Sequence, residues 1–313
     1  MKFLAIRLVS AFAIFVALAG CGTVAVSPTA IDQGSGRSVL KASIPYSGET
    51  ALAELNAWYM DTTPDCGSAT RPAFLCSGVM MRQVETSPNY LSWDPSSSAI
   101  TLGGISVSWL RADSNFPNLW KPNGFIFYPD YDIPVGKYHP AVLCAFPLDG
   151  YTWQRPSQGC GRYLTHPQSR PCDELGITTA AGWIANYYAG GGGVDIHSQE
   201  CGWNVRQGQP GTASRFYQNV LARAQLQPQH WYYWNELMLA TWTTGKGATL
   251  PIHSFFFKTG DNVARAHAQS DQQRYHNLYG RGLPIFRLTL PTSIAGRAQF
   301  TYDPTDQVVT PTY

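Results

Sequence analysis

The segment 231–242 holds the residues whose types most strongly suggest chemistry. It reads Trp-Tyr-Tyr-Trp-Asn-Glu-Leu-Met-Leu-Ala-Thr-Trp and places Asn235 and Glu236 side by side among aromatic and aliphatic residues. No Gly or Pro interrupts the chain between Pro228 and Gly245, and apolar residues recur at helical spacing, so we expect a buried helix. Full burial raises a carboxyl pKa by roughly 3–5 units unless it is compensated. Glu236 is therefore expected to act in a structural ion pair or in catalysis.

Five further polar residues lie at expected strand ends or on otherwise apolar elements: Arg82, Ser106, Ser108, Arg111 and Asp271. Side chains alternate along a strand, so both serines are expected on one face. Asp271 falls on the apolar side of an expected helix, and we count it among the candidate substrate-binding residues. Solvated strand ends would explain the arginines without any function, and both interpretations stay open.

A carboxylate beside an amide, near serines, arginines and aromatic rings, suits cleavage of a glycosidic bond through an oxocarbenium-like transition state. In this hypothesis Glu236 is the catalytic carboxylate and Asn235 orients it. Arg82 or Arg111 would bind phosphate, and Ser108 would contact the ribose.

Residues that commonly bind metals or phosphate are not arranged for that purpose. The sequence has no H-E-x-x-H and no C-x-x-C, and His267 and His276 are expected on opposite sides of their helix. We therefore expect no metal and no cofactor. His253 lies among aromatic residues of an expected strand, which favours a core histidine. The Gly190–Gly193 run follows a helix and lacks phosphate-loop spacing, which indicates a lid or linker.

The N-terminus has the pattern of a targeting segment. Two basic residues, Lys2 and Arg7, precede an apolar run, which ends in Leu18-Ala-Gly-Cys21. This ending resembles a bacterial lipobox, so we expect a signal peptide over residues 1–20, a lipid on Cys21 as the membrane contact, and a flexible tether over 21–46. Gly22 after the cysteine suggests the outer membrane. The alternative is an ordinary secretory signal and a secreted protein.

Charge argues against nucleic acid as a partner. The chain has 22 basic and 20 acidic residues, and removing Lys2 and Arg7 leaves 20 of each. A neutral chain without a basic cluster lacks the usual nucleic-acid footprint.

The cysteines predict a disulfide framework. Besides Cys21 there are six: Cys66, Cys76, Cys144, Cys160, Cys172 and Cys201. In an exported protein three disulfides are the default, although fifteen pairings are possible. Short loops favour Cys66–Cys76, and less strongly Cys160–Cys172 with Cys144–Cys201.

The pattern of elements predicts an α+β fold, a mixed sheet with helices packed against it. Expected helices run from Ser47 to Met60, from about residue 180 to Gly190, and over 215–226; expected strands cover 74–82, 100–110, 125–128, 141–146 and 299–302. Residues 250–258, 262–279 and 283–290 read as strand, helix and strand, which implies two parallel strands. We expect one domain over 47–307 and a tail over 308–313.

Several blocks of the chain resemble the halovibrin family. They are Pro72–Val79, Ser92–Ser96, Gly124–Pro129, Val142–Pro147, Asn235–Trp242 and Asp271–Tyr275, within a likeness spanning roughly residues 50–307. The resemblance implies an exported bacterial enzyme that acts on NAD, as a glycohydrolase or ADP-ribosyltransferase.

The order of the candidate residues partly follows the common ADP-ribosyltransferase pattern. Arg82 and Ser106-Val-Ser108 match its arginine and its Ser-x-Ser, in that order. The only Q-x-E, Gln83-Val-Glu85, comes too early, and Asn235-Glu236 is not such a motif. This departure weakens transfer more than hydrolysis.

We therefore expect an exported lipoprotein of the bacterial cell envelope that cleaves NAD, a small-molecule dinucleotide substrate, at its nicotinamide–ribose bond. The alternative, from another class, is a non-catalytic surface lipoprotein that binds carbohydrate or a partner protein through exposed aromatic residues. The oligomeric state stays open.

Overall fold

The structure is a computed structural model that describes residues 47–84, 89–148, 160, 171–189, 201–226 and 231–312. Residues 45–313 form one compact unit. The expected signal peptide, Cys21, the tether and the Gly190–Gly193 run lie outside the described residues. No described helix is both long enough and apolar enough to cross a membrane.

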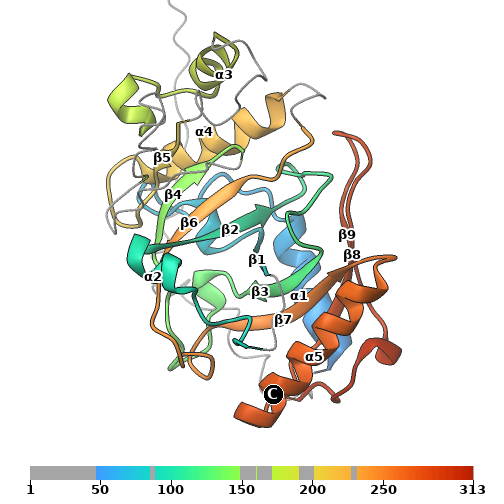
Figure 1. Cartoon of the computed structure of the whole chain (residues 1–313). Helices are drawn as coiled ribbons and strands as arrows, with labels where there is room; N and C mark the ends of the chain where they lie inside the picture. Colours follow the sequence, from blue (N-terminus) through green and yellow to red (C-terminus); the bar gives the residue numbers. More distant parts are fainter. Residues whose placement is uncertain are drawn as a thin grey trace, which may run out of the picture. The chain divides into compact units, whose positions relative to one another are not determined.

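A mixed sheet organises the described residues, which confirms the α+β prediction (Figure 1). Its strand order is β5-β4-β6-β2-β1-β3-β7-β8-β9, and only the β7–β8 pair is parallel. The strands are β1 (Val79–Gln83), β2 (Gly104–Leu110), β3 (Asn123–Phe127), β4 (Val142–Phe146), β5 (Trp203–Asn204), β6 (Glu236–Ala240), β7 (Ile252–Lys258), β8 (Ile285–Thr289) and β9 (Gln299–Tyr302).

Helices lie near both ends of the sheet in Figure 1, with α4 close to β4 and β5, α3 packed on α4, and α5 along β7. The α-helices are α1 (Gly48–Met60), α2 (Ser97–Leu102), α3 (Ala180–Ala189), α4 (Thr212–Gln225) and α5 (Asn262–Tyr279). Short 3₁₀ turns are η1 (Ala73–Leu75), η2 (Asp130–Asp132), η3 (Cys172–Leu175) and η4 (Pro304–Asp306).

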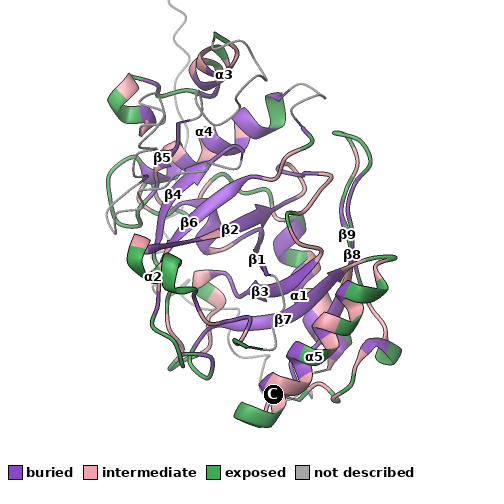
Figure 2. Ribbon diagram, in the orientation of Figure 1, coloured by how far each residue is buried: buried purple, intermediate pink, exposed green. Residues whose placement is uncertain are grey.

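The two faces of the sheet carry separate apolar clusters, and most strand residues are buried (Figure 2). The first cluster joins strand residues such as Leu237 and Phe125 to α3, α4 and α5. The second joins alternate strand residues such as Met81 and Ile126 to α1. Because neighbouring strand residues point to opposite faces, cluster membership shows which face a side chain occupies.

The helix starts follow the local signals in the sequence. Ser47 and Asp261 cap α1 and α5 through side-chain oxygens that accept hydrogen bonds from the amides of Thr50 and Ala264. Gly280, with φ of 70°, ends α5 in the left-handed conformation that glycine tolerates best. The predicted parallel pair is confirmed, because β7, α5 and β8 form a strand–helix–strand unit.

The helix predicted over residues 231–242 is wrong. Residues 236–240 form β6, which lies between β2 and β4 and pairs with both. Leu237 and Leu239 pack into the first cluster, whereas Met238 packs on the other face with Cys144 and Phe146. A central strand buried on both faces is apolar throughout, and periodicity alone does not distinguish it from a buried helix.

Two other predicted strands begin with short helical turns. The range 74–82 divides into η1 and β1, and the range 100–110 contains the end of α2 before β2 begins. Ser96 caps α2 and Gly103, with φ of 75°, ends it. The sequence contains this capping serine and this glycine, but the apolar residues that follow them led to the prediction of one continuous strand.

The cysteines form three disulfides, as predicted. Cys66–Cys76 is confirmed, but the other pairs are Cys144–Cys160 and Cys172–Cys201, so the alternative pairing favoured by the sequence is wrong. Backbone contacts explain the choice. The Cys172 amide donates to the Gly202 carbonyl at 2.8 Å, beside Cys201. The Cys160 amide donates to Asn204, which pairs directly with Cys144.

Replacing both Cys172 and Cys201 by alanine should lower the free energy of unfolding by about 3–4 kcal/mol, because their bridge closes a long loop in the unfolded chain. Urea unfolding followed by tryptophan fluorescence measures this loss. The matched control is the Cys66 and Cys76 double variant, whose residues are 10 apart instead of 29 and whose loss should be smaller. A larger loss for the shorter loop would contradict the argument.

Candidate functional site

Three candidate residues come together on adjacent strands. Arg82 is on β1, Ser106 on β2 and Glu236 at the start of β6. The Ser106 hydroxyl donates to Glu236 Oε1, and the Arg82 guanidinium donates through Nη1 to the Ser106 carbonyl. Residues distant in sequence are thereby joined through one serine, whose hydroxyl and carbonyl serve different partners.

The carboxylate of this group is buried, while its neighbours are less so. Glu236 is 1% exposed, whereas Ser106 and Arg82 are partly exposed. Glu236 alternates with Leu237, so it lies on the face opposite the first cluster, next to Met238 and across from Phe146 of β4. The carboxylate therefore lies beside apolar residues, and Ser106, which donates to it, is partly exposed.

Ser108 is placed differently from the sequence hypothesis. It is 2% exposed, and its hydroxyl accepts a hydrogen bond of 2.7 Å from Gln83 Nε2. The Gln83 oxygen in turn accepts from the backbone amides of Trp120 and Lys121. Ser108 thus connects strands and a loop, and Ser106 is the better candidate for contact with a ligand.

Sequence reasoning missed Gln83. It is 5% exposed and links β1, β2 and the loop before β3 through three hydrogen bonds. The one signal in the sequence was an amide in phase with Val79 and Met81, on a side of the strand that should be apolar. Such a residue needs partners, but only tertiary structure supplies their identity.

The Asn235 side chain hydrogen-bonds to the backbone of β2 and not to the Glu236 carboxylate, so it does not orient that group directly. Its Oδ1 accepts from the Trp109 amide at 2.9 Å, and its Nδ2 donates to the Trp109 carbonyl at 2.7 Å. The side chain extends the β2–β6 pairing one step beyond the strand. Asn235 therefore fixes where β6, and with it Glu236, begins.

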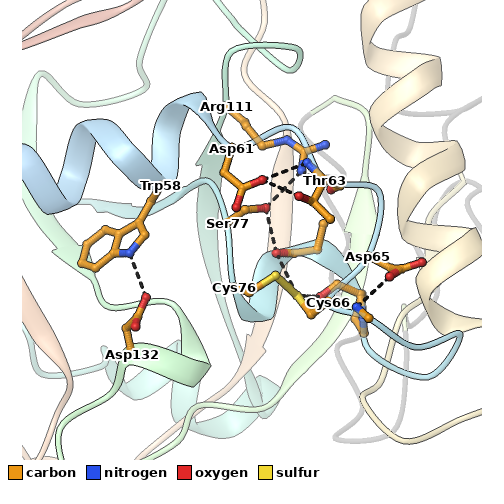
Figure 3. Close-up of a disulfide and its surroundings, with 12 residues drawn as sticks. Trp58, Asp61, Thr63, Asp65, Cys66, Cys76, Ser77, Arg111 and Asp132 are labelled. Carbon is orange, nitrogen blue, oxygen red and sulfur yellow. Dashed lines mark hydrogen bonds between the residues drawn. A yellow bond between two sulfur atoms is a disulfide. The ribbon is translucent and has the colours of Figure 1, made fainter. Parts of the chain in front are cut away.

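Arg111 lies in a structural network (Figure 3). It is fully buried and forms a two-point ion pair with Asp113 at 2.7 and 3.0 Å. It also donates to Ser77 and to the Thr63 carbonyl, and Figure 3 labels both of these residues beside it. Its guanidinium also stacks over Trp109, 4.7 Å from the ring centroid. Because these partners occupy its donors, we leave Arg111 out of the phosphate site.

Asp271 lies on the other side of the sheet from Glu236. It is on α5, whose apolar residues join the first cluster, and Ser92 donates to its carboxylate at 2.7 Å. Burial raises the pKa of Asp271 to about 6, despite the opposing effects of the Ser92 hydrogen bond and the charges of Arg274 and His267. It is a buried acid separate from the candidate site.

Comparisons with known proteins found no relative of this chain. No protein family matches the chain, and no curated protein matches its sequence. Among the described residues, no three His, Cys, Asp or Glu side chains group in a way that could hold a metal ion. The candidate site is therefore Glu236 with Ser106. Arg82 alternates with Met81 and points, like Met80 and Val84, to the face of the first cluster. Its side chain therefore lies across the sheet from Glu236, and the expectation that it shares a site with Glu236 is wrong.

Replacing Asn235 by alanine should lower the free energy of unfolding by about 2–4 kcal/mol, because it leaves two buried backbone groups of Trp109 without partners. Chemical denaturation of the variant measures the loss. Asn277 is exposed on α5, so Asn277→Ala is the control and should change stability by less than about 0.5 kcal/mol. Equal effects of the two changes would rule out the pairing role.

Asp271 should make the protein less stable as pH rises. The pKa of Asp271 in the folded state lies above the ordinary value. The protonated carboxyl therefore contributes its full stabilisation below about pH 4, and this contribution is lost as pH rises through about 6. The loss amounts to roughly 3 kcal/mol. Asp271→Asn should remove this slope and be more stable than wild type at pH 8. Urea unfolding at pH 4 and 8 tests this, and an unchanged slope would contradict it.

Proposed function

We propose that the protein hydrolyses NAD at the nicotinamide–ribose bond, with Glu236 as the catalytic carboxylate. The observation that carries the proposal is the hydrogen-bonded arrangement of Arg82, Ser106 and Glu236 on three neighbouring strands. Their order in the chain is that of the arginine, Ser-x-Ser and glutamate of ADP-ribosyltransferases. The resemblance to the halovibrin family supports the same substrate.

Each residue has a physical role in this reaction. Loss of nicotinamide leaves positive charge on the ribose, and a buried carboxylate at Glu236 stabilises that charge more strongly than it would in water. Ser106 holds the carboxylate in position through its hydroxyl. Arg82, on the other face of the sheet, donates to the Ser106 carbonyl and so helps to position Ser106 beside Glu236. Water then adds to the ribose, giving ADP-ribose, nicotinamide and one proton.

Hydrolysis is favoured over transfer to another molecule. In the transferase pattern a glutamine or glutamate stands two positions before the catalytic glutamate, whereas this chain has Trp234 there. An indole has no oxygen with which to bind or deprotonate an acceptor group. Water is small and abundant, so it can act as the nucleophile without a dedicated residue to bind it.

We further propose that the enzyme is an exported lipoprotein of the bacterial envelope, anchored through Cys21. Disulfides persist in oxidising compartments, and the three in this chain fit an envelope or extracellular location. The lipobox-like Leu18–Cys21 segment supports the anchor. Mass spectrometry of the exported protein would detect the lipid on its N-terminal cysteine.

Purified protein incubated with NAD should release nicotinamide, and Glu236→Gln should lower kcat by 100-fold or more, on the order of 3 kcal/mol in transition-state stabilisation. Ser106→Ala should lower kcat less, because it leaves the carboxylate in place. Chromatography of free nicotinamide measures the rates.

Glu49→Gln is the control, since Glu49 is exposed in the first turn of α1 and should not affect the rate. If wild type releases no nicotinamide, or if Glu236→Gln retains the full rate, the hydrolase proposal fails and the non-catalytic alternative gains support.

A further inference from the structure

A surface hollow of about 500 Å³ lies at one edge of the sheet, close to the start of β6. Its walls come from the loop after β2, from the segment before β6, and from the ends of β7 and β8. The residues that matter here are Pro117, Asn118, Trp231, Tyr232, Lys258 and Leu290. Volumes of this size are typical of small-molecule sites.

The walls of the hollow are fixed by buried contacts. Arg223 of α4 is 1% exposed and donates to the carbonyls of Asn115, at 3.0 Å, and Trp231, at 2.9 Å. One guanidinium thereby joins two of the segments that line the hollow. Asn118 adds a weaker bond of 3.4 Å to the Tyr232 carbonyl. The hollow is therefore a preformed part of the fold.

The lining of the hollow combines aromatic rings with one positively charged side chain, that of Lys258. Tyr232 is 62% exposed, and Tyr233 contacts its ring at right angles. Lys258 is partly buried in the wall. Among the described lining residues there is one cation and no acidic side chain. This combination suits a planar ring that carries a negatively charged group.

The hollow and the proposed catalytic carboxylate share one side of the sheet. Leu288 and Leu290, which line the hollow, belong to the second cluster, and Glu236 lies on the face opposite the first. Tyr232 precedes Glu236 by four residues, so their Cα atoms are at most about 14 Å apart. A dinucleotide can span such a distance with one half at each point.

We infer that the hollow binds the adenylate half of the dinucleotide, with adenine against Tyr232 and a phosphate near Lys258. The inference rests on the proposed function, since it assigns the part of the substrate that does not react. The nicotinamide half then reaches Glu236. Binding energy from the adenylate would hold the ribose in place for cleavage, as remote contacts do in many enzymes.

The test uses AMP and adenosine as ligands of the full-length protein, with affinity measured by calorimetry. Wild type should bind AMP several-fold more tightly than adenosine. Tyr232→Ala should weaken both ligands about tenfold, by loss of stacking, and Tyr232→Phe should not. Lys258→Met should remove the preference for AMP while leaving adenosine affinity unchanged. Tyr131→Ala, at another exposed tyrosine, is the matched control.

The outcomes separate this inference from the hydrolase proposal. Glu236→Gln should retain AMP affinity even though it lowers the rate of nicotinamide release by 100-fold or more. If AMP fails to bind wild type, or if Tyr232→Ala binds AMP as wild type does, the adenylate site is overturned, whatever the hydrolysis assay shows. If AMP binding depends on Tyr232 and Lys258 but no nicotinamide is released, the hollow stands and the reaction must be reassigned.

Discussion

The pairing of β6 on both of its edges is the constraint on which the candidate site depends. β2 and β4 supply backbone partners to a five-residue strand, and the Asn235 amide supplies one more pair at its start. A strand held in this way has no freedom to slip by one residue, which would turn Glu236 to the other face. The position of one carboxylate thus follows from hydrogen bonds that do not involve it.

Polar residues within the sheet are tolerated because they satisfy one another. Gln83 and Ser108 are buried, and each finds a partner on a neighbouring strand or loop. A buried amide without partners would cost about 1–3 kcal/mol for each missing bond. Together with Ser106 and Glu236, they form a polar row across β6, β2 and β1, bordered by apolar clusters. Such a row restricts the strands to one register.

Among the described residues three acidic side chains are buried, Glu236, Asp271 and Asp306, and the first two lie on opposite faces of the sheet. Glu236 and Asp271 are equally buried, at 1% exposure, and each accepts a hydrogen bond from a serine. Glu236 accepts from partly exposed Ser106 and begins β6, a few residues after Trp231 and Tyr232, which line the hollow. Asp271 joins a helix to the segment around Ser92, and its raised pKa is a consequence of burial alone.

Local signals in the sequence determined much of the fold. Capping residues such as Ser47 and Asp261 set the helix starts, and the order of elements predicted the parallel β7–β8 pair, because these features depend on neighbours along the chain. Residue types also singled out Glu236. Tertiary structure alone decided that residues 236–240 form a strand, which cysteines pair, and that Asn235 serves the backbone. Those outcomes depend on contacts between distant segments, and composition and spacing do not encode which segments meet.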